Sequence, residues 1–520
     1  MTTLSSGVRT LTDPVVVTTG GLRVEDVVRV ARDHAPLLLS ADVTDRVAEG
    51  RAVVERALRD DRLVYGLNTY LGHRRDERVP AEALVEYQEF IVATHVGGIG
   101  DPLPDDDVRA LLTARIAGLA RGGSGISPEA VDALVALLNA GVHPWVPASG
   151  SVGASDLTHL AAVAEVLTGF GWVNAGGERA PGGQALARAG LEPYSMRPKD
   201  GIALISANAT SIGLGALAVA DAERVARLAD HAGALTVEAL SGNVSAFDAE
   251  VAAGKPFPGQ VAVSAHVRSL LHGSRLQRPG TARHVQDPIS VRTIPQVHGA
   301  LRDQLAAVRN AVEIELNAVD DNPLVSVDRD ELLSNGNFSP MVLALSFESA
   351  RLGLAHAGML SERRVHKLLS ARRPTVTEGV RGKRLPNLLV NAAASILAEL
   401  KHTALPVTLN GSPLNFDVED HAPLAPQAVA LTRQAIARLE TLLAIELVVA
   451  ADTIELEDGG RSLGAGTGRI YRRIRAIRDE LVADGSPAML VEAVAASLRD
   501  SDPAVVPALT APAPAEEVSA

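Results

Sequence analysis

The segment covering residues 426–456 constrains the fold of this chain more than any other part of the sequence. Its apolar residues recur on most sides of a helix, and a helix that is apolar all round is buried. About 31 residues that each rise about 1.5 Å would form a helix about 46 Å long. Three other long segments, 210–240, 294–319 and 341–369, share this Ala/Leu-rich helical pattern. Because one chain has difficulty covering several such helices, we predict a bundle shared between subunits.

The composition supports a mainly α-helical protein. Hydrophobic residues make up 47% of the 520 residues and aromatic residues only 3%, so Ala, Leu and Val must build the core. Ala and Leu are strong helix formers. Before residue 210 the elements are shorter and the loops are rich in Gly and Pro, which indicates a smaller, loop-rich N-terminal domain that carries the active-site segment. We predict four parts: a disordered N-terminus (1–14), the N-terminal domain (15–209), the helical bundle with a C-terminal helical region (210–510), and a disordered tail (511–520).

Charge and residue usage exclude several functions. The formal net charge of −13, without a dense basic stripe, argues against nucleic acid as a partner. The absence of cysteine excludes disulfides, thiolate nucleophiles and zinc sites with sulfur ligands. No His/Asp/Glu cluster has metal-ligand spacing, so no metal is expected. The sequence has neither a signal-peptide pattern nor an apolar run of membrane-spanning length, so we expect a cytoplasmic protein without a membrane partner.

A run of small residues, Gly150-Ser-Val-Gly-Ala-Ser-Asp156, precedes a helical pattern. Glycine and other small residues let backbone atoms approach one another closely, as a backbone that cyclises on itself requires. A tight turn before a helix requires the same residues. Taken alone, the motif favours the turn.

Tyr65 and His95 each have a chemical and a structural interpretation. Tyr65 stands before a glycine in a polar loop, where it either carries a proton or holds the loop as an aromatic plug. His95 follows an apolar run and precedes glycines, which is typical of a core histidine unless the ring lines a cavity.

Three irregular segments later in the chain carry polar side chains. Gln286 and Arg292 flank Pro288, and the planar guanidinium of Arg292 suits either a substrate carboxylate or an inter-subunit ion pair. Asn322 lies in an Asp-Asn-Pro turn and Phe338 ends a Gly-Asn-Phe turn, each of which turn chemistry alone would explain. Glu419 belongs to an Asp-Val-Glu-Asp-His cluster that supplies a general base, binds a cationic ring or forms a solvated turn.

Each segment is weak by itself, but their order along residues 25–500 resembles the aromatic amino acid ammonia-lyase family, most closely its histidine ammonia-lyases. The resemblance implies a mainly helical homotetramer whose active sites are each built from three subunits. It also implies a small-molecule amino-acid substrate and an electrophilic group, 4-methylidene-imidazol-5-one (MIO), which forms by cyclisation of an Ala-Ser-Gly triad.

The resemblance assigns roles to residues of this sequence. Ala154 and Ser155 would be the first two residues of the triad, with Asp156 in the third place. Tyr65 would be the catalytic tyrosine and Arg292 the group that binds the substrate carboxylate. The remaining positions would bind the substrate, with His95 and Glu419 facing its side chain: Gln286, Asn322, Phe338, and either Ser206 or Asn208 where the family has asparagine.

The sequence departs from the family pattern at several of these positions. Asp156 follows Ser155 directly, so the glycine of the triad is missing. Ser206, Ile289 and Tyr70 stand where the family usually has asparagine, tyrosine and glycine.

The predicted function is the elimination of ammonia from an aromatic amino acid, L-histidine to urocanate, through MIO formed from Ala154, Ser155 and Asp156. Two alternatives stay open. One is an MIO-independent elimination of another amine leaving group from a histidine-like substrate, and the other is a 2,3-aminomutase of secondary metabolism.

Overall fold

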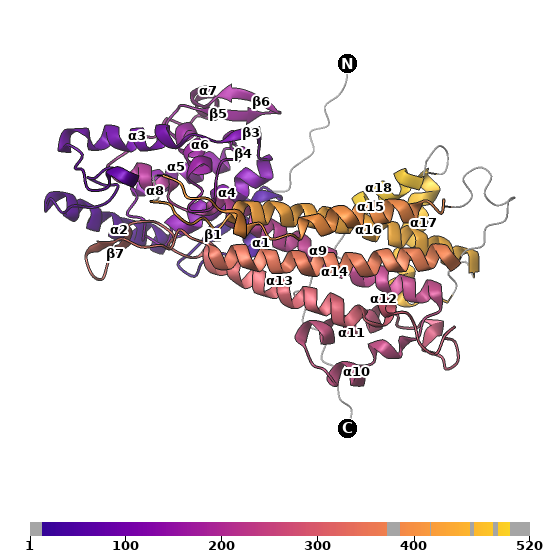
Figure 1. Ribbon diagram of the computed structural model, residues 1–520. Coiled ribbons are helices and arrows are strands. Elements are labelled where there is room, and N and C mark those ends of the chain that lie inside the picture. The colour runs from indigo at the N-terminus through magenta and orange to yellow at the C-terminus, as the bar shows by residue number, and fades with distance from the viewer. Residues whose placement is uncertain (1–12, 372–384, 416–417, 458–461, 482–486, 500–520) are drawn as a thin grey trace, which may run out of the picture. The chain divides into compact units, whose positions relative to one another are not determined.

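The computed structural model describes residues 13–371, 385–415, 418–457, 462–481 and 487–499. Helices dominate this part of the chain, and its strands are short and pair in two-stranded sheets (Figure 1). The prediction of a mainly α-helical fold is confirmed. The predicted disordered tail (511–520) and residues 1–12 of the predicted disordered N-terminus lie outside the described residues.

The four long helical segments predicted from the sequence all form single long helices. Their bounds are α9 (Ala209–Leu240), α13 (Ile294–Leu316), α14 (Met341–Ala371) and α16 (Ala425–Glu457) (Figure 1). In α16, every residue from Leu442 to Ala451 exposes at most 2% of its surface. This single chain therefore covers that stretch by itself, and the stretch does not require a second subunit.

The chain forms two compact units that interleave along the sequence. The first contains residues 1–220, 309–345 and 407–429, and the second contains residues 221–308, 346–406 and 430–520. Each of the four long helices passes from one unit into the other. The domain boundary predicted between residues 209 and 210 falls at the first residues of α9.

All the strands of the described chain belong to the first unit. Its further helices are α1 (Val24–Ala31), α2 (Ala41–Arg59), α3 (Leu84–His95), α4 (Asp105–Leu119), α5 (Pro128–Asn139), α6 (Leu157–Leu167), α7 (Gly182–Ala189) and α8 (Asp200–Ile205). A parallel pair joins β1 (Val15–Val17) and β2 (Leu37–Leu39). The antiparallel pairs join β3 (Ile99–Pro102) to β4 (Pro147–Ser149), β5 (Trp172–Ala175) to β6 (Glu178–Pro181), and β7 (Leu324–Ser326) to β8 (Glu331–Leu333).

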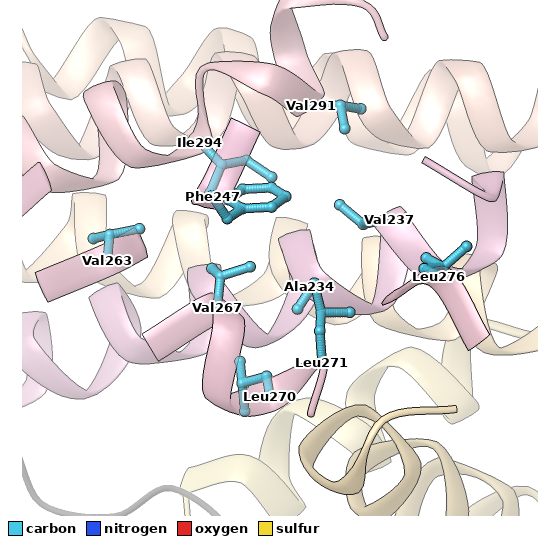
Figure 2. Close-up of a cluster of buried hydrophobic side chains, with 10 residues drawn as sticks. All are labelled: Ala234, Val237, Phe247, Val263, Val267, Leu270, Leu271, Leu276, Val291 and Ile294. Atoms are coloured by element: carbon cyan, nitrogen blue, oxygen red, sulfur yellow. The ribbon is translucent and has the colours of Figure 1, made fainter. Parts of the chain in front are cut away.

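The described residues of the second unit form helices and loops, without a strand. Besides the long helices it contains α10 (Ala249–Ala253), α11 (Pro258–Leu270), α12 (Ile289–Arg292), α15 (Leu389–Thr403), α17 (Ala465–Leu481) and α18 (Pro487–Arg499). Figure 2 shows part of its core, in which Phe247 lies among aliphatic side chains of α9, α11, α12 and α13. The cluster is built from valine, leucine, isoleucine and alanine around this one aromatic ring, as the low aromatic content predicts.

One helical stretch, residues 200–240, is long and apolar enough to cross a membrane by length and composition. Every residue in its most apolar window is buried inside the protein. A core helix has this property, and the helix packs here as one.

Candidate active site

A pocket of about 510 Å³ lies within the first unit. Its lining combines loops that are far apart in the sequence with the starts of two helices. The lining residues are Tyr65, Leu71, Gly72, Arg75, Asp76, His95, Ala154, Ser155, Leu157, Ile202, Ser206, Asn322, Ser334, Asn335, Phe338, Asn415, Val418 and Glu419. The pocket therefore brings together most of the residues singled out from the sequence.

The loop that carries Tyr65 is anchored on both sides of the ring. Val64 and Leu67 are buried in a hydrophobic cluster with residues of α2 and β7. The Val64 amide donates to Asn68 Oδ1 at 2.8 Å, and Asn68 Nδ2 donates to the Arg62 carbonyl at 2.8 Å. Because its neighbours are fixed in this way, Tyr65 is held at the pocket wall.

The Tyr65 hydroxyl accepts a hydrogen bond from the Gly72 amide at 3.2 Å. Gly72 has a φ of +61°, and a Cβ atom added there would lie 2.6 Å from Asn415 Nδ2. The same Asn415 Nδ2 donates to Glu419 Oε1 at 3.2 Å. A residue without a side chain is thus needed where the tyrosine loop meets the loop that carries Glu419.

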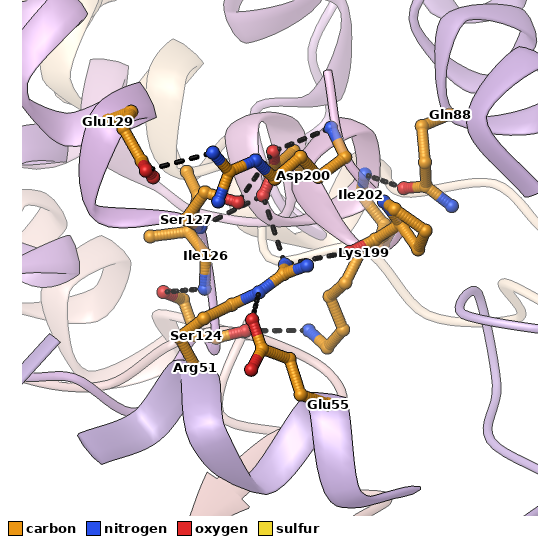
Figure 3. A network of polar contacts seen from close by, with 12 residues as sticks. Arg51, Glu55, Gln88, Ser124, Ile126, Ser127, Glu129, Lys199, Asp200 and Ile202 are labelled. Atoms are coloured by element: carbon orange, nitrogen blue, oxygen red, sulfur yellow. Dashed lines mark hydrogen bonds and ion pairs between the residues drawn. The ribbon is translucent and has the colours of Figure 1, made fainter. Parts of the chain in front are cut away.

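A network of polar contacts surrounds the first residues of α8 (Figure 3), and one of its members also contacts the tyrosine loop. Gln88 of α3 connects them, because its Oε1 accepts from the Ile202 amide and its Nε2 donates to the Gly66 carbonyl, each at 3.2 Å. The fully buried Asp200 accepts from the Ser127 amide at 2.9 Å and from the Ser127 hydroxyl at 3.0 Å. Beside it, burial lowers the pKa of Lys199 to about 8. This network fixes the helix from which Ile202 reaches the pocket.

His95 is the last residue of α3, and its ring orientation is defined by one contact. Nδ1 lies 2.6 Å from the Ile91 carbonyl oxygen. Because a carbonyl only accepts, the hydrogen on the neutral ring is assigned to Nδ1, and Nε2 keeps a free lone pair. His95 can therefore accept a hydrogen bond from a ligand in the pocket.

The turn between β4 and α6 places Ala154 and Ser155 in the lining and Asp156 behind it. Ser155 has a φ of +58°, and its amide donates to the Phe338 carbonyl at 3.1 Å. The Asp156 amide donates to the Ala207 carbonyl at 2.6 Å. Asp156 is fully buried, so it does not line the pocket with the other two residues.

The carboxylate of Asp156 is enclosed by two serines. Its Oδ1 accepts from the Ser151 hydroxyl at 2.7 Å, and its Oδ2 accepts from the Ser211 amide at 2.9 Å and the Ser211 hydroxyl at 3.1 Å. These contacts tie the turn to the first residues of α9.

Of the two polar candidates between α8 and α9, Ser206 reaches the pocket and Asn208 does not. The Ser206 hydroxyl accepts from the Asn322 amide at 3.3 Å. Asn208 faces the protein instead: its amide donates to Asp320 Oδ2 at 2.7 Å, and its Nδ2 donates to the Phe338 carbonyl at 2.8 Å. Phe338 thus receives hydrogen bonds from both Asn208 and Ser155.

Two buried carboxylates, Asp320 and Asp321, precede Asn322 and share one cation. Arg115 Nη2 donates to Asp321 Oδ1 at 2.9 Å, and Arg115 Nη1 lies 3.6 Å from Asp320 Oδ1. Burial raises the pKa of Asp320 to about 7, although Arg115 acts in the opposite direction. Arg115 is therefore an ion-pair partner of both carboxylates.

Comparison with known proteins identifies the family. Residues 22–476 match the family described as aromatic amino acid lyase. The chain belongs to the aromatic amino acid lyase family. It is 40% identical to the histidine ammonia-lyase of Anaeromyxobacter sp. (strain K) over 455 residues, which cover 84% of this chain and 89% of that protein. The identity to the histidine ammonia-lyase of Caldanaerobacter subterraneus subsp. tengcongensis is 36% over 478 residues, or 90% of this chain and 93% of that protein.

Solved structures agree with this assignment. The ergothioneine-degrading enzyme ergothionase of Treponema denticola has a TM-score of 0.86 and 27% identity, covering 94% of this chain and 99% of its own. A tyrosine aminomutase of Streptomyces globisporus has a TM-score of 0.87 and 30% identity, covering 93% and 96% of the two chains. The predicted family and enzyme class, a carbon–nitrogen lyase, are confirmed.

Besides Asp156 and Asn208, two further lyase positions named from the sequence lie outside this pocket. Gln286 and Arg292 belong to the second unit. There the Gln286 side-chain amide lies against the Arg292 guanidinium. Ile289, between them, is 62% exposed. The pocket that a single chain forms therefore lacks the arginine predicted to bind the substrate carboxylate.

The substitution of tyrosine for glycine at position 70 does not narrow the pocket, because Tyr70 does not line it. Its ring packs edge-on against the ring of Tyr87, with 5.1 Å between the centroids. The Arg74 guanidinium carbon also lies 3.8 Å from the Tyr70 ring centroid. The Tyr70 ring therefore packs the tyrosine loop against α3, outside the pocket.

Sequence reasoning missed several lining residues of this lyase pocket. Asn335 and Asn415 belong to polar turns that the sequence marked, and their amides were a detectable signal. Arg75 and Asp76 gave no such signal, because adjacent charged residues in a loop are typical of solvent-exposed positions. A literal Ala-Ser-Gly at 148–150 spans the end of β4, which pairs with β3, and does not line the pocket.

Proposed function

We propose that this chain eliminates the α-amine of an imidazole-bearing amino acid, with L-histidine as the first substrate to test and urocanate as the product. The proposal rests on the observation that Tyr65, His95 and Glu419 line one pocket. The names of the relatives that are 36–40% identical support the choice of histidine.

The reaction needs a base at Cβ and a leaving group at Cα. Tyr65, as phenolate, takes one proton from Cβ, the electron pair of that C–H bond forms the double bond, and the Cα–N bond breaks. An α-ammonium group leaves as neutral ammonia. The Gly72 amide, already 3.2 Å from the Tyr65 oxygen, stabilises negative charge there before the proton arrives.

The substrate ring would lie between His95 and Glu419. His95 Nε2 accepts one ring N–H, and the Glu419 carboxylate accepts the other and stabilises the protonated ring. A protonated imidazole withdraws electrons from the adjacent Cβ, which makes the Cβ proton easier to remove. Ring binding therefore contributes to the chemistry as well as to specificity.

Replacing Glu419 with glutamine tests this arrangement. With L-histidine we expect the KM to rise about 10–100-fold, because a hydrogen bond to a charged group contributes about 1.5–3 kcal/mol. Urocanate formation is followed by its ultraviolet absorbance, with ammonia measured in parallel. The matched control, Asp420→Asn, changes an exposed neighbour outside the pocket and should leave the KM unchanged. An unchanged KM in Glu419→Gln would remove Glu419 from the ring-binding site.

Arg292 and Gln286 would bind the carboxylate in the pocket of another copy, within a homotetramer. Two features support this arrangement. Arg292 belongs to the unit that does not contain this pocket. Helix α14 also exposes Leu345, Leu352 and Met359, which recur every seven residues along one face. Such a stripe is typical of a helix that packs against a partner helix.

The family implies MIO at residues 154–156, where the group would supply an electrophile for the substrate amine. The contacts of Asp156 do not fit cyclisation, so the proposed reaction contains no step that depends on the group. This observation favours a second candidate substrate, the α-trimethylammonium betaine of histidine, because a tertiary amine leaves without prior activation. The structural similarity to an ergothioneine-degrading enzyme agrees with such a substrate.

A cytoplasmic location of this protein stays a prediction.

A further inference from the structure

The atom that would close an MIO ring is already used in a hydrogen bond. Cyclisation requires the Asp156 nitrogen to attack the Ala154 carbonyl carbon, after which that carbonyl oxygen and the Ser155 hydroxyl leave in two molecules of water. In the product ring the Asp156 nitrogen carries no hydrogen. Here its N–H donates to the Ala207 carbonyl at 2.6 Å in a buried position, and the ring would leave that carbonyl facing an atom that cannot donate.

The Ser155 amide raises the same conflict. Its nitrogen also loses its hydrogen in the ring, and here it donates to the Phe338 carbonyl at 3.1 Å. The backbone amide of this residue is therefore held by a contact that suits an open peptide.

The side chain of Asp156 resists the movement that ring closure would need. Ser151 and Ser211 hydrogen-bond to its carboxylate, and neither serine lines the pocket. A glycine would have no such attachment, and its amide would be free to approach the Ala154 carbonyl. The Asp156 side chain, which a glycine would lack, thus helps to keep the Asp156 backbone nitrogen at the Ala207 carbonyl.

The Ser155 hydroxyl is the group that remains available. Ser155 lines the pocket, and its Oγ has no hydrogen-bond partner among the residues that the structure describes. A hydroxyl in this place can donate to a substrate carboxylate or accept from an amine.

We propose that residues 154–156 stay an open peptide, and that Ser155 serves as a hydrogen-bonding residue for the substrate instead of the precursor of an electrophile. The substrate amine then leaves without first bonding covalently to the protein. This assignment concerns the chemical state of the turn, so it does not depend on which amine the enzyme removes.

Mass spectrometry of the peptide that contains residues 154–156, released from the purified protein by a protease, tests the proposal. We expect the mass of the unmodified sequence, and a spectrum unchanged by prior treatment with borohydride. A peptide lighter by two molecules of water would overturn the proposal. Because this readout does not use turnover, an inactive protein with an unmodified peptide would refute the proposed function and leave the open turn supported.

Turnover by Ser155→Ala provides a second readout. Loss of one neutral hydrogen bond predicts a fall in kcat/KM of less than about tenfold. A fall of more than about a thousandfold, with the melting temperature unchanged, would show that Ser155 forms an essential electrophile and would overturn the proposal.

Discussion

Replacing Tyr65 with phenylalanine is expected to lower kcat/KM by about 10²–10⁴-fold, the usual contribution of a positioned general base. The change removes the oxygen that accepts the Cβ proton and leaves the ring in place. Val64 and Leu67 stay buried on either side of the position, so the loop should keep its conformation. Initial rates of urocanate formation and the circular dichroism spectrum of the variant check the two parts of this expectation.

The matched control is Tyr70→Phe in the same loop. Tyr70 lies outside the pocket and packs against the ring of Tyr87 through its own ring, which phenylalanine retains. We expect its kcat/KM to stay within about threefold of the wild-type value. If Tyr65→Phe keeps more than a tenth of the activity, Tyr65 is not the base.

Replacing Arg115 with methionine should produce the largest loss of stability. Removal of one partner from a buried ion pair typically costs about 3–5 kcal/mol, since it leaves a buried charge uncompensated. Here Asp320 and Asp321 both depend on this guanidinium. Because Asp320 also holds the Asn208 amide, we expect activity to fall together with stability.

The effect of Arg115→Met should depend on pH. Asp320 has a folded-state pKa of about 7, above its ordinary value of 3.8, so its stabilising contribution is lost as the pH rises through about 7. Without Arg115 the pKa rises further, and protonation at pH 5 relieves part of the cost. Urea unfolding should therefore show a larger loss of unfolding free energy at pH 8 than at pH 5.

A surface arginine provides the comparison for this variant. Arg197→Met breaks an exposed pair with Glu129, and exposed pairs contribute only about 0–1 kcal/mol. If the two variants lose equal stability, or if the Arg115→Met loss is independent of pH, the two aspartates do not depend on Arg115.

The sequence predicted the long helices well because their signal is local. Apolar residues at helical spacing over some 30 positions determine both the type of an element and its burial, so α16 forms where residues 426–456 predict it. The pocket residues with distinctive local motifs were also found, including Tyr65, Ser155 and Glu419. Each lies in a loop whose composition does not suit a core.

Contacts between distant segments were not predictable from these patterns. Nothing local in the sequence shows that the Asp156 amide meets the Ala207 carbonyl, or that Asn208 faces Asp320 and not the pocket. Arg292 was assigned by resemblance to the same site as Tyr65, but Arg292 belongs to the other unit and does not line the pocket. No local pattern in the sequence shows how two segments from different units are arranged.

The most direct measurement is the mass of the product formed from substrate that carries two deuterium atoms on Cβ, using whichever of L-histidine and its betaine turns over faster. Removal of one Cβ hydrogen by Tyr65 predicts urocanate with a single deuterium, released with one equivalent of ammonia or trimethylamine. A β-amino acid would instead identify an aminomutase. A product that keeps both deuterium atoms would contradict elimination in this pocket.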